Sequence, residues 1–215
     1  MISQNHMIAT FHGQLFVKLQ TGDTTIAINP ISKESGKKVT RFGSDICLVT
    51  TKLPICTGTD QVDNAGKTPF VISGPGEYEV KDISIKGIQS KYLYNGEEKI
   101  NTIYIFNFDG MKICVLGAIH EKLDADARDA ISSCDILFVP VLEHEKNNYL
   151  KASDAVAVAN NLEAKIIIPV GYDDKTLPTF LKEAGATGVR AIEKLTIKKK
   201  ELDGKEGVVV VLDEI

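Results

Sequence analysis

Residues 101–117 read NTIYIFNFDGMKICVLG, two apolar runs separated by the dipeptide Asp109-Gly110. Short apolar runs of this kind are typical of β-strands. A two-residue Asp-Gly connection between such runs is the strongest short-range signal of a hairpin. The stretch therefore predicts a β-hairpin over residues 102–116.

The chain on either side of this hairpin follows two different patterns. Upstream, short strand-like runs succeed one another. Downstream, helices are predicted over residues 123–133, 151–164 and 176–186, and buried strands over residues 135–141 and 165–170. The tail predicts a second hairpin, with residues 193–202 paired to residues 206–215. This order indicates an α/β protein with two sheets packed face to face and helices on the outside.

Composition places the chain among ordinary folded proteins. Of its 215 residues, 43% are hydrophobic and 25% are charged, and the net charge is -4. We expect one domain spanning residues 1–215. Basic residues are scattered apart from Lys198–Lys200, so we expect no nucleic-acid partner. The sequence shows neither a signal-peptide pattern nor a long apolar run, and we expect a cytoplasmic protein with no membrane partner.

The cysteines and histidines do not form a metal-binding pattern. Cys47, Cys56, Cys114 and Cys134 lie far apart in the sequence, and we expect buried, reduced thiols. No CxxC pair occurs, and no two of the four histidines stand two or four residues apart. The local pairing of ligands that is usual in zinc sites is therefore absent.

Several strings, in order along the chain, resemble one known family. The most specific is SGPGEYEVKDISIKGI at residues 73–88, and others lie at residues 13–30, 45–50, 101–117, 134–141 and 165–172. On these strings the chain resembles the metallo-β-lactamase superfamily, in a short bacterial branch of zinc-dependent hydrolases similar to the L-ascorbate-6-phosphate lactonase group. The resemblance implies an α/β fold of the four-layer αββα sandwich type.

The resemblance also implies where metal ligands should stand. Enzymes of this family bind zinc through a His-x-His-x-Asp-His motif, a third His, a bridging Asp and a last His. Carried over by position, these ligands fall at Thr51, Leu53, Ile55, Cys56, Tyr92, Ala118 and Gly171. Side chains of Leu, Ile and Ala, and a Gly, offer no atom that binds zinc. We therefore expect that these positions line a degenerate cleft, with no catalytic residue, no metal and no cofactor.

A few polar residues are weaker candidates for a rebuilt site: His120, His144, Asp173 and Asp174. His120 lies near the position of the bridging Asp, and a solvated position at the start of a helix is the simpler interpretation. His144 lies in a polar stretch that is more simply a solvated loop. The pair Asp173 and Asp174 is interpreted as the N-cap of the following helix.

Two functions from different classes follow from these expectations. The first is a metal-free, catalytically degenerate protein that keeps the fold for ligand binding or assembly. The alternative is a metal-dependent hydrolase of the same superfamily with a rebuilt active site, using some of Cys56, His120, His144, Asp173 and Asp174. A homo-oligomer or a protein partner is expected with either function, and the sequence does not identify a small-molecule ligand.

Overall fold

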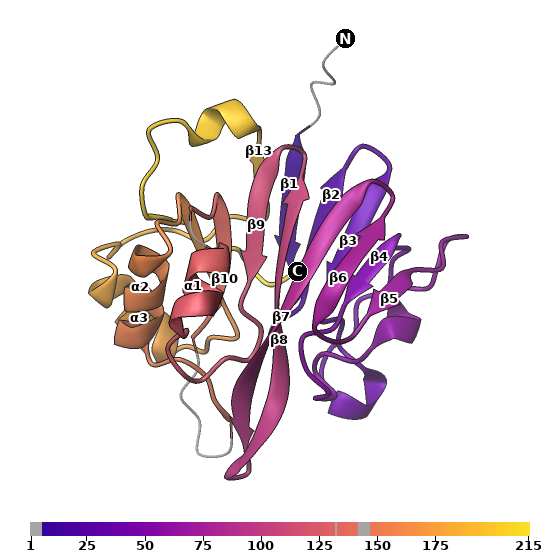
Figure 1. Cartoon of the computed structure of the whole chain (residues 1–215), viewed down its shortest axis with the longest axis horizontal. Coiled ribbons are helices and arrows are strands. Elements are labelled where there is room, and N and C mark those ends of the chain that lie inside the picture. The colour runs from indigo at the N-terminus through magenta and orange to yellow at the C-terminus, as the bar shows by residue number, and fades with distance from the viewer. Residues whose placement is uncertain (1–5, 132, 142–146) are drawn as a thin grey trace.

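The computed structural model describes residues 6–131, 133–141 and 147–215, which form two β-sheets facing each other (Figure 1). One apolar cluster contains side chains of both sheets, among them Leu19 and Ile28 of the first and Tyr104 and Phe138 of the second. Since each sheet buries one face against the other, this cluster is the central core of the molecule.

The first sheet has the strand order β13-β1-β2-β3-β4-β5. Its strands are β1 (Met7–Phe11), β2 (Val17–Thr21), β3 (Thr24–Ile28), β4 (Ile46–Leu48), β5 (Phe70–Ile72) and β13 (Leu195–Ile197). Strands β3, β4 and β5 run parallel to one another, whereas β13, β1, β2 and β3 pair antiparallel. The carboxyl ends of the parallel strands therefore share one edge of this sheet.

The second sheet has the order β11-β7-β8-β9-β10-β12-β14, and β6 pairs with β7 beside this path. Its strands are β6 (Gly76–Val80), β7 (Ile83–Tyr94), β8 (Glu97–Phe108), β9 (Met111–Val115), β10 (Ile136–Pro140), β11 (Asn147–Asn148), β12 (Ile166–Val170) and β14 (Val208–Val209). Strands β7 and β8 form a long ribbon that extends below the rest of the sheet in Figure 1. The predicted hairpin around Asp109-Gly110 is confirmed as β8 and β9.

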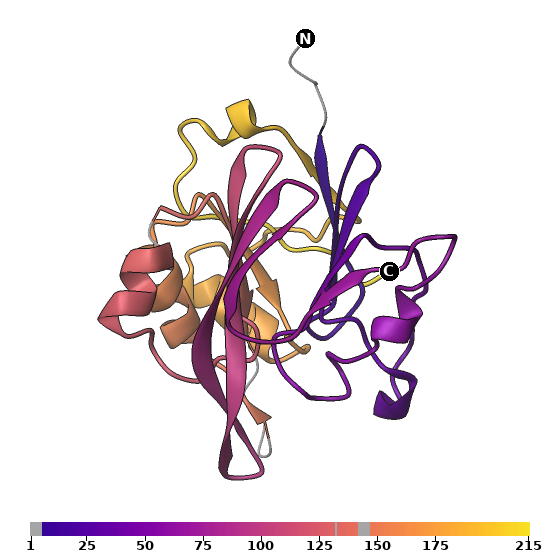
Figure 2. The ribbon, with the colours of Figure 1, turned by 45° about the vertical axis from the view of Figure 1, so that its right-hand side comes forward.

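The three α-helices of the described residues cover the outer face of the second sheet (Figure 2). They are α1 (Ala125–Ile131), α2 (Ala152–Asn161) and α3 (Thr176–Glu183), within the three predicted segments. Over the first sheet lie loops and the 3-10 helices η1 (Lys33–Ser35) and η2 (Thr59–Gln61). The predicted fold class is confirmed, and the layer over the first sheet is irregular chain rather than α-helix. No helix of the described residues is long and apolar enough to cross a membrane.

The predicted hairpin in the tail is wrong. Strand β13 pairs with β1 of the first sheet, and β14 pairs with β12 of the second sheet. The 3-10 helix η3 (Lys199–Leu202) lies between them, and Lys199 Nζ forms an ion pair with the buried carboxylate of Asp135. The tail therefore bridges the two sheets, because each of its apolar strands completes a different sheet edge.

Two buried aspartates hold equivalent places at the amino ends of the parallel strands. Asp45 precedes β4, and its Oδ2 accepts a hydrogen bond of 2.8 Å from Thr25 N. Asp135 precedes β10, and its Oδ2 accepts one of 2.8 Å from Lys112 N. In return, Asp45 N donates to Thr25 O and Asp135 N donates to Lys112 O. The two sheets thus repeat one arrangement of strand, Asp and parallel strand.

Lysines neutralise the aspartate of the first sheet. Lys67 Nζ lies 2.7 Å from Asp45 Oδ2, and Lys81 Nζ pairs with Oδ1. Burial alone would raise the pKa of Asp45, but the hydrogen bonds from both lysines and from the backbone lower this pKa to about 2. The carboxylate therefore stays ionised, because the hydrogen bonds and the lysine charges favour its charged form more than burial disfavours it.

All four cysteines are free and buried, which confirms the expectation of reduced thiols.

A buried imidazole lies near the end of β1. The ring centroid of His12 is 4.9 Å from that of Phe16 and 5.6 Å from that of Phe42. Its Nδ1 has no hydrogen-bond partner among the described residues. Burial, with a smaller contribution from the charge of Lys18, lowers the pKa of His12 from 6.5 to about 4.

We expect His12 to make folding pH-dependent. Between pH 6.5 and about 4 the unfolded chain takes up a proton at His12 that the folded chain does not, so the free energy of unfolding falls as the pH falls through this window. Urea unfolding at a series of pH values measures the slope. His12→Phe keeps an aromatic ring between the two phenylalanines and should reduce the slope in this window. An equal slope in both proteins would contradict the assignment.

Candidate functional site

The carboxyl ends of β3 and β4 are joined by a buried asparagine. Asn29 follows β3, and its Oδ1 accepts hydrogen bonds of 2.8 Å from Thr50 N and 3.0 Å from Thr50 Oγ1. The backbone of Asn29 has a φ of 53°, in the left-handed region that asparagine tolerates better than most residues. A neutral amide thus holds the two strand ends together, where a carboxylate would carry a charge.

A second buried asparagine holds the corresponding edge of the other sheet. Asn101 Nδ2 donates to Leu116 O at 2.8 Å, and Asn101 Oδ1 accepts from Ala118 N at 2.9 Å. The same Nδ2 also donates to Ser90 Oγ at 2.7 Å. Gly117 has a φ of 69°, and a Cβ there would lie 2.3 Å from Asn101 Oδ1. Only glycine therefore allows this close approach of backbone and amide.

Between these edges lies a buried cluster of side chains, which we call the strand-end cluster. Its members are part of the central core, are at most 5% exposed and come from four segments of the chain: Leu53, Cys56, Tyr92, Ala118 and Tyr149. Ile55 is half-buried and packs against the same core, and Thr51 is buried near Tyr92. The fold thus brings together most of the positions that the resemblance singled out.

Gly171 belongs to the same neighbourhood through its backbone. Its N donates to Gln14 O at 2.6 Å, and its φ is 68°. A Cβ at Gly171 would lie 3.0 Å from Leu15 Cδ2 and 3.1 Å from Tyr149 Cε2. These two side chains therefore occupy the space into which a larger residue at position 171 would extend.

The electrostatics of the strand-end cluster favour uncharged groups. Burial raises the pKa of Cys56 and of Tyr149 far above neutral pH, and it also raises the pKa of Tyr92. Thr51 neighbours the Tyr92 hydroxyl without hydrogen-bond geometry, and its Oγ1 has no partner among the described residues. The cluster holds no imidazole and no carboxylate. It does not fit the zinc ligand set of histidines and aspartates that the resemblance implies.

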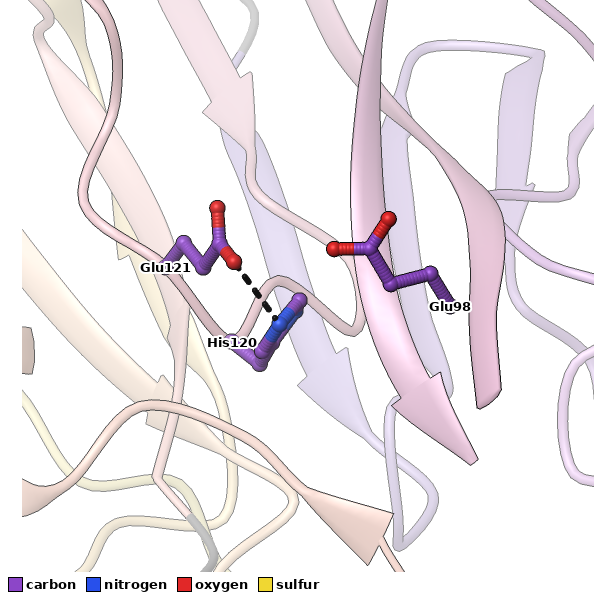
Figure 3. A group of neighbouring side chains, drawn as sticks. All are labelled: Glu98, His120 and Glu121. Carbon is purple, nitrogen blue, oxygen red and sulfur yellow. Dashed lines mark ion pairs between the residues drawn. The ribbon is translucent and has the colours of Figure 1, made fainter. Parts of the chain in front are cut away.

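A different group of side chains lies at the surface nearby, which we call the rim group: Glu98, His120 and Glu121. One ligand atom from each lies within 4.8 Å of the others. Figure 3 shows Glu98 extending from β8 toward His120 and Glu121, which lie in the loop after β9. His120 Nε2 is 3.2 Å from Glu121 Oε1. An imidazole and two carboxylates are ligands that Zn²⁺ and Mn²⁺ accept.

Backbone and charge contacts position the rim group. His120 Nδ1 lies 3.1 Å from the carbonyl oxygen of Lys91, on β7. Lys91 Nζ lies 2.6 Å from Glu98 Oε2. This hydrogen bond, followed by the charge of Lys91, lowers the pKa of Glu98. Both carboxylates are largely exposed, so solvent screens these interactions.

The structure assigns roles to the other predicted site residues. Asp173 Oδ1 accepts hydrogen bonds from Lys175 N at 2.9 Å and from Thr176 N at 2.7 Å, in the turn that leads into α3. The N-cap residue of α3 is Lys175 and not one of the two aspartates. Asp174 is exposed. His144 lies outside the described residues. Within the described ranges, neither Cys56 nor these aspartates join His120 in a ligand group.

Sequence reasoning missed three contributors to this region. Glu98 lies 22 positions before His120, and only the pairing of β8 with β9 brings it near. Tyr149 follows β11 and reaches the strand-end cluster from far along the chain. Asn101 directly precedes the predicted hairpin, as an amide between Ile100 and the run that begins at Thr102. That isolated amide is a signal that could have been read from the sequence.

Comparison with known proteins identifies relatives of this fold. Residues 9–171 match the family model described as the beta-lactamase superfamily domain. The chain is 22% identical over 198 residues to the UPF0173 metal-dependent hydrolase lin1612 of Listeria innocua, covering 78% of this chain and 86% of that protein.

Solved structures of metallo-beta-lactamase proteins are also similar to this chain. A protein of Thermotoga maritima assigned to the Zn-dependent hydrolases of the metallo-beta-lactamase superfamily is 25% identical, with a TM-score of 0.77, covering 96% of this chain and 99% of that chain. The metallo-beta-lactamase fold protein YhfI of Bacillus subtilis is 9% identical, with a TM-score of 0.60 and 96% of each chain covered, which supports the fold alone.

These findings correct one expectation. The sequence predicted no metal and no cofactor, because the implied ligand positions offer few donor atoms. The Listeria innocua relative is named a metal-dependent hydrolase, and the described residues include a group that could hold a metal ion. The prediction was wrong because it considered the positions carried over by resemblance and a few further polar residues, His120 among them, but neither Glu98 nor Glu121.

We expect Asn101 to be essential for the stability of the strand ends. Asn101→Leu leaves Ala118 N and Leu116 O buried without partners, and unpaired buried groups of this kind cost about 1–3 kcal/mol each. Urea unfolding should show a loss of about 2–4 kcal/mol. Ser90→Ala removes only the half-buried partner of the same amide and should cost clearly less. Equal losses in the two variants would contradict this role of Asn101.

Proposed function

The chain belongs to the beta-lactamase superfamily domain family, and from this premise we propose that it is a metal-dependent hydrolase whose metal site is the rim group. The observation that carries the proposal is the convergence of Glu98, His120 and Glu121 within 4.8 Å. The relative from Listeria innocua that is named a metal-dependent hydrolase supports it.

The surroundings of His120 suit a metal ligand. Its Nδ1 lies 3.1 Å from the carbonyl oxygen of Lys91. Because a carbonyl oxygen can only accept a hydrogen bond, this contact requires the proton on Nδ1. Donation from Nδ1 leaves the lone pair on Nε2, the atom beside Glu121. Metal-binding histidines commonly have such a second hydrogen bond, because it fixes the tautomer and the ring orientation.

The two carboxylates complete the proposed site from separate elements. Glu98 is supplied by the β7–β8 ribbon, and Glu121 by the loop after β9. A bound divalent ion would polarise a substrate oxygen and acidify a water molecule, which is the hydrolytic chemistry that such ions supply. In this proposal Glu98, His120 and Glu121 hold the ion, and the ribbon and the loop orient them.

The proposed site is distinct from the positions carried over by resemblance. Successive side chains of a strand alternate between faces, so Lys91 is exposed while Tyr92 is buried in the strand-end cluster. Leu53, Ala118 and Gly171 provide no side-chain donor on the buried side. The metal is therefore proposed at the rim and not in the interior.

A second candidate function is favoured by the packing of the strand-end cluster. Leu53, Cys56 and Ala118 are at most 5% exposed and belong to the central core. This packing supports a catalytically degenerate member that is kept for ligand binding or for assembly with itself or a protein partner. In that case an ion at the rim group would join the ribbon to the loop without hydrolysis.

Metal binding tests the rim group directly. Protein stripped with a chelator and titrated with Mn²⁺ in a calorimeter should bind about one equivalent per chain. Glu98→Gln and His120→Ala should each raise the Kd for Mn²⁺ at least about tenfold, since each substitution removes one of the three proposed ligands. Glu97→Gln is the matched control, because Glu97 is the neighbouring residue of β8 and pairs with Lys99. No heat of binding in the wild type would refute the site.

Turnover separates the two candidate functions. A panel of chromogenic phosphodiesters, lactones and thioesters, assayed with Mn²⁺ or Zn²⁺, should show hydrolysis that His120→Ala abolishes and Glu97→Gln leaves unchanged. Metal binding without turnover of any of these classes favours the degenerate member. Metal-dependent hydrolysis that survives in His120→Ala would place the active site elsewhere.

A further inference from the structure

A lysine ammonium is already placed against the rim group. Lys91 Nζ lies 2.6 Å from Glu98 Oε2, and the side chain of Lys91 is 54% exposed. The hydrogen bond and charge of Glu98, with a smaller contribution from the charge of Glu121, raise the pKa of Lys91. The negative charges of both carboxylates in the rim group thus stabilise the charged form of Lys91.

We propose that the Lys91 ammonium occupies the cation position of the rim group and limits metal loading, so that a divalent ion binds only after the ammonium has left Glu98. This inference rests on the proposed function, because it concerns the same three ligands. Glu98 Oε2 can be the close partner of an ammonium or of a metal ion, and two cations at one carboxylate repel each other.

The backbone and the side chain of Lys91 act in opposite directions. Its carbonyl oxygen lies 3.1 Å from His120 Nδ1 and prepares the imidazole for a metal, whereas its ammonium competes with that metal at Glu98. A change of the side chain leaves the carbonyl in place. The competition can therefore be removed without removing the contact that positions His120.

The same ribbon provides a matched control. Lys99 on β8 forms an ion pair with Glu97, and its side chain is 45% exposed. Lys99 lies directly opposite Tyr92 in the β7–β8 register, and its partner Glu97 is outside the rim group. Lys99→Gln therefore changes the net charge of the ribbon by the same amount as Lys91→Gln without freeing a ligand.

The test compares Mn²⁺ affinity in the wild type, Lys91→Gln, Lys91→Arg and Lys99→Gln by calorimetry at low ionic strength. We expect Lys91→Gln to lower the Kd for Mn²⁺ about three- to tenfold. The difference in Kd between this variant and the wild type should become smaller as salt is added. Lys91→Arg keeps the charge and should resemble the wild type, as should Lys99→Gln.

The outcomes separate this inference from the proposed function. If the wild type binds Mn²⁺ and Lys91→Gln binds it no more tightly, the competition is refuted and the rim site stands. If Lys99→Gln tightens binding as much as Lys91→Gln, the effect is one of general charge, and the competition is refuted as well. If neither the wild type nor Lys91→Gln binds Mn²⁺, the proposed metal site itself is refuted.

Discussion

The hydrogen bonds of Asn101 to the main chain of residues 116 and 118 are the constraint on which the strand-end region depends. Buried backbone groups must find partners, and at this edge a neutral amide provides them without bringing a charge into the interior. Asn29 does the same between β3 and β4. Because uncharged amides rather than carboxylates bind the main chain at both edges, the space between them can be filled with apolar and weakly acidic side chains.

Burial then determines the electrostatics of the strand-end cluster. Cys56, Tyr92 and Tyr149 lie in a medium that disfavours their charged forms, so burial raises their pKa values. Charged groups that could hold a divalent ion lie instead where water reaches them, at Glu98, His120 and Glu121. In this protein the interior between the sheets stabilises the fold, and the rim group contains the side chains that could hold a metal ion.

At the opposite ends of the parallel strands, charge is buried and paired. Asp45 and Asp135 each bind the backbone of a neighbouring strand and two lysine ammonium groups. One lysine of the Asp135 set, Lys199, comes from the tail that joins the sheets. These paired carboxylates tie distant segments together at one end of the molecule, while the amide-lined edge at the other end stays neutral.

The sequence by itself determined the local elements and the fold class. The hairpin at Asp109-Gly110, the three helices and the buried strands follow from periodicity and turn residues, which act over a few positions. It could not determine that β13 and β14 join different sheets, because sheet pairing depends on packing between segments far apart in the chain.

For the candidate site, too, the sequence determined one part and the tertiary structure decided the rest. Leu53, Cys56, Tyr92 and Ala118 are buried in one apolar core, yet the sequence did not reveal that Tyr149 and Leu15 fill the space beside Gly171. Nor did it reveal that Glu98 meets His120 and Glu121. Glu98 and His120 are 22 residues apart and become ligands of one proposed site only when β8 and β9 pair, which is a property of the tertiary structure.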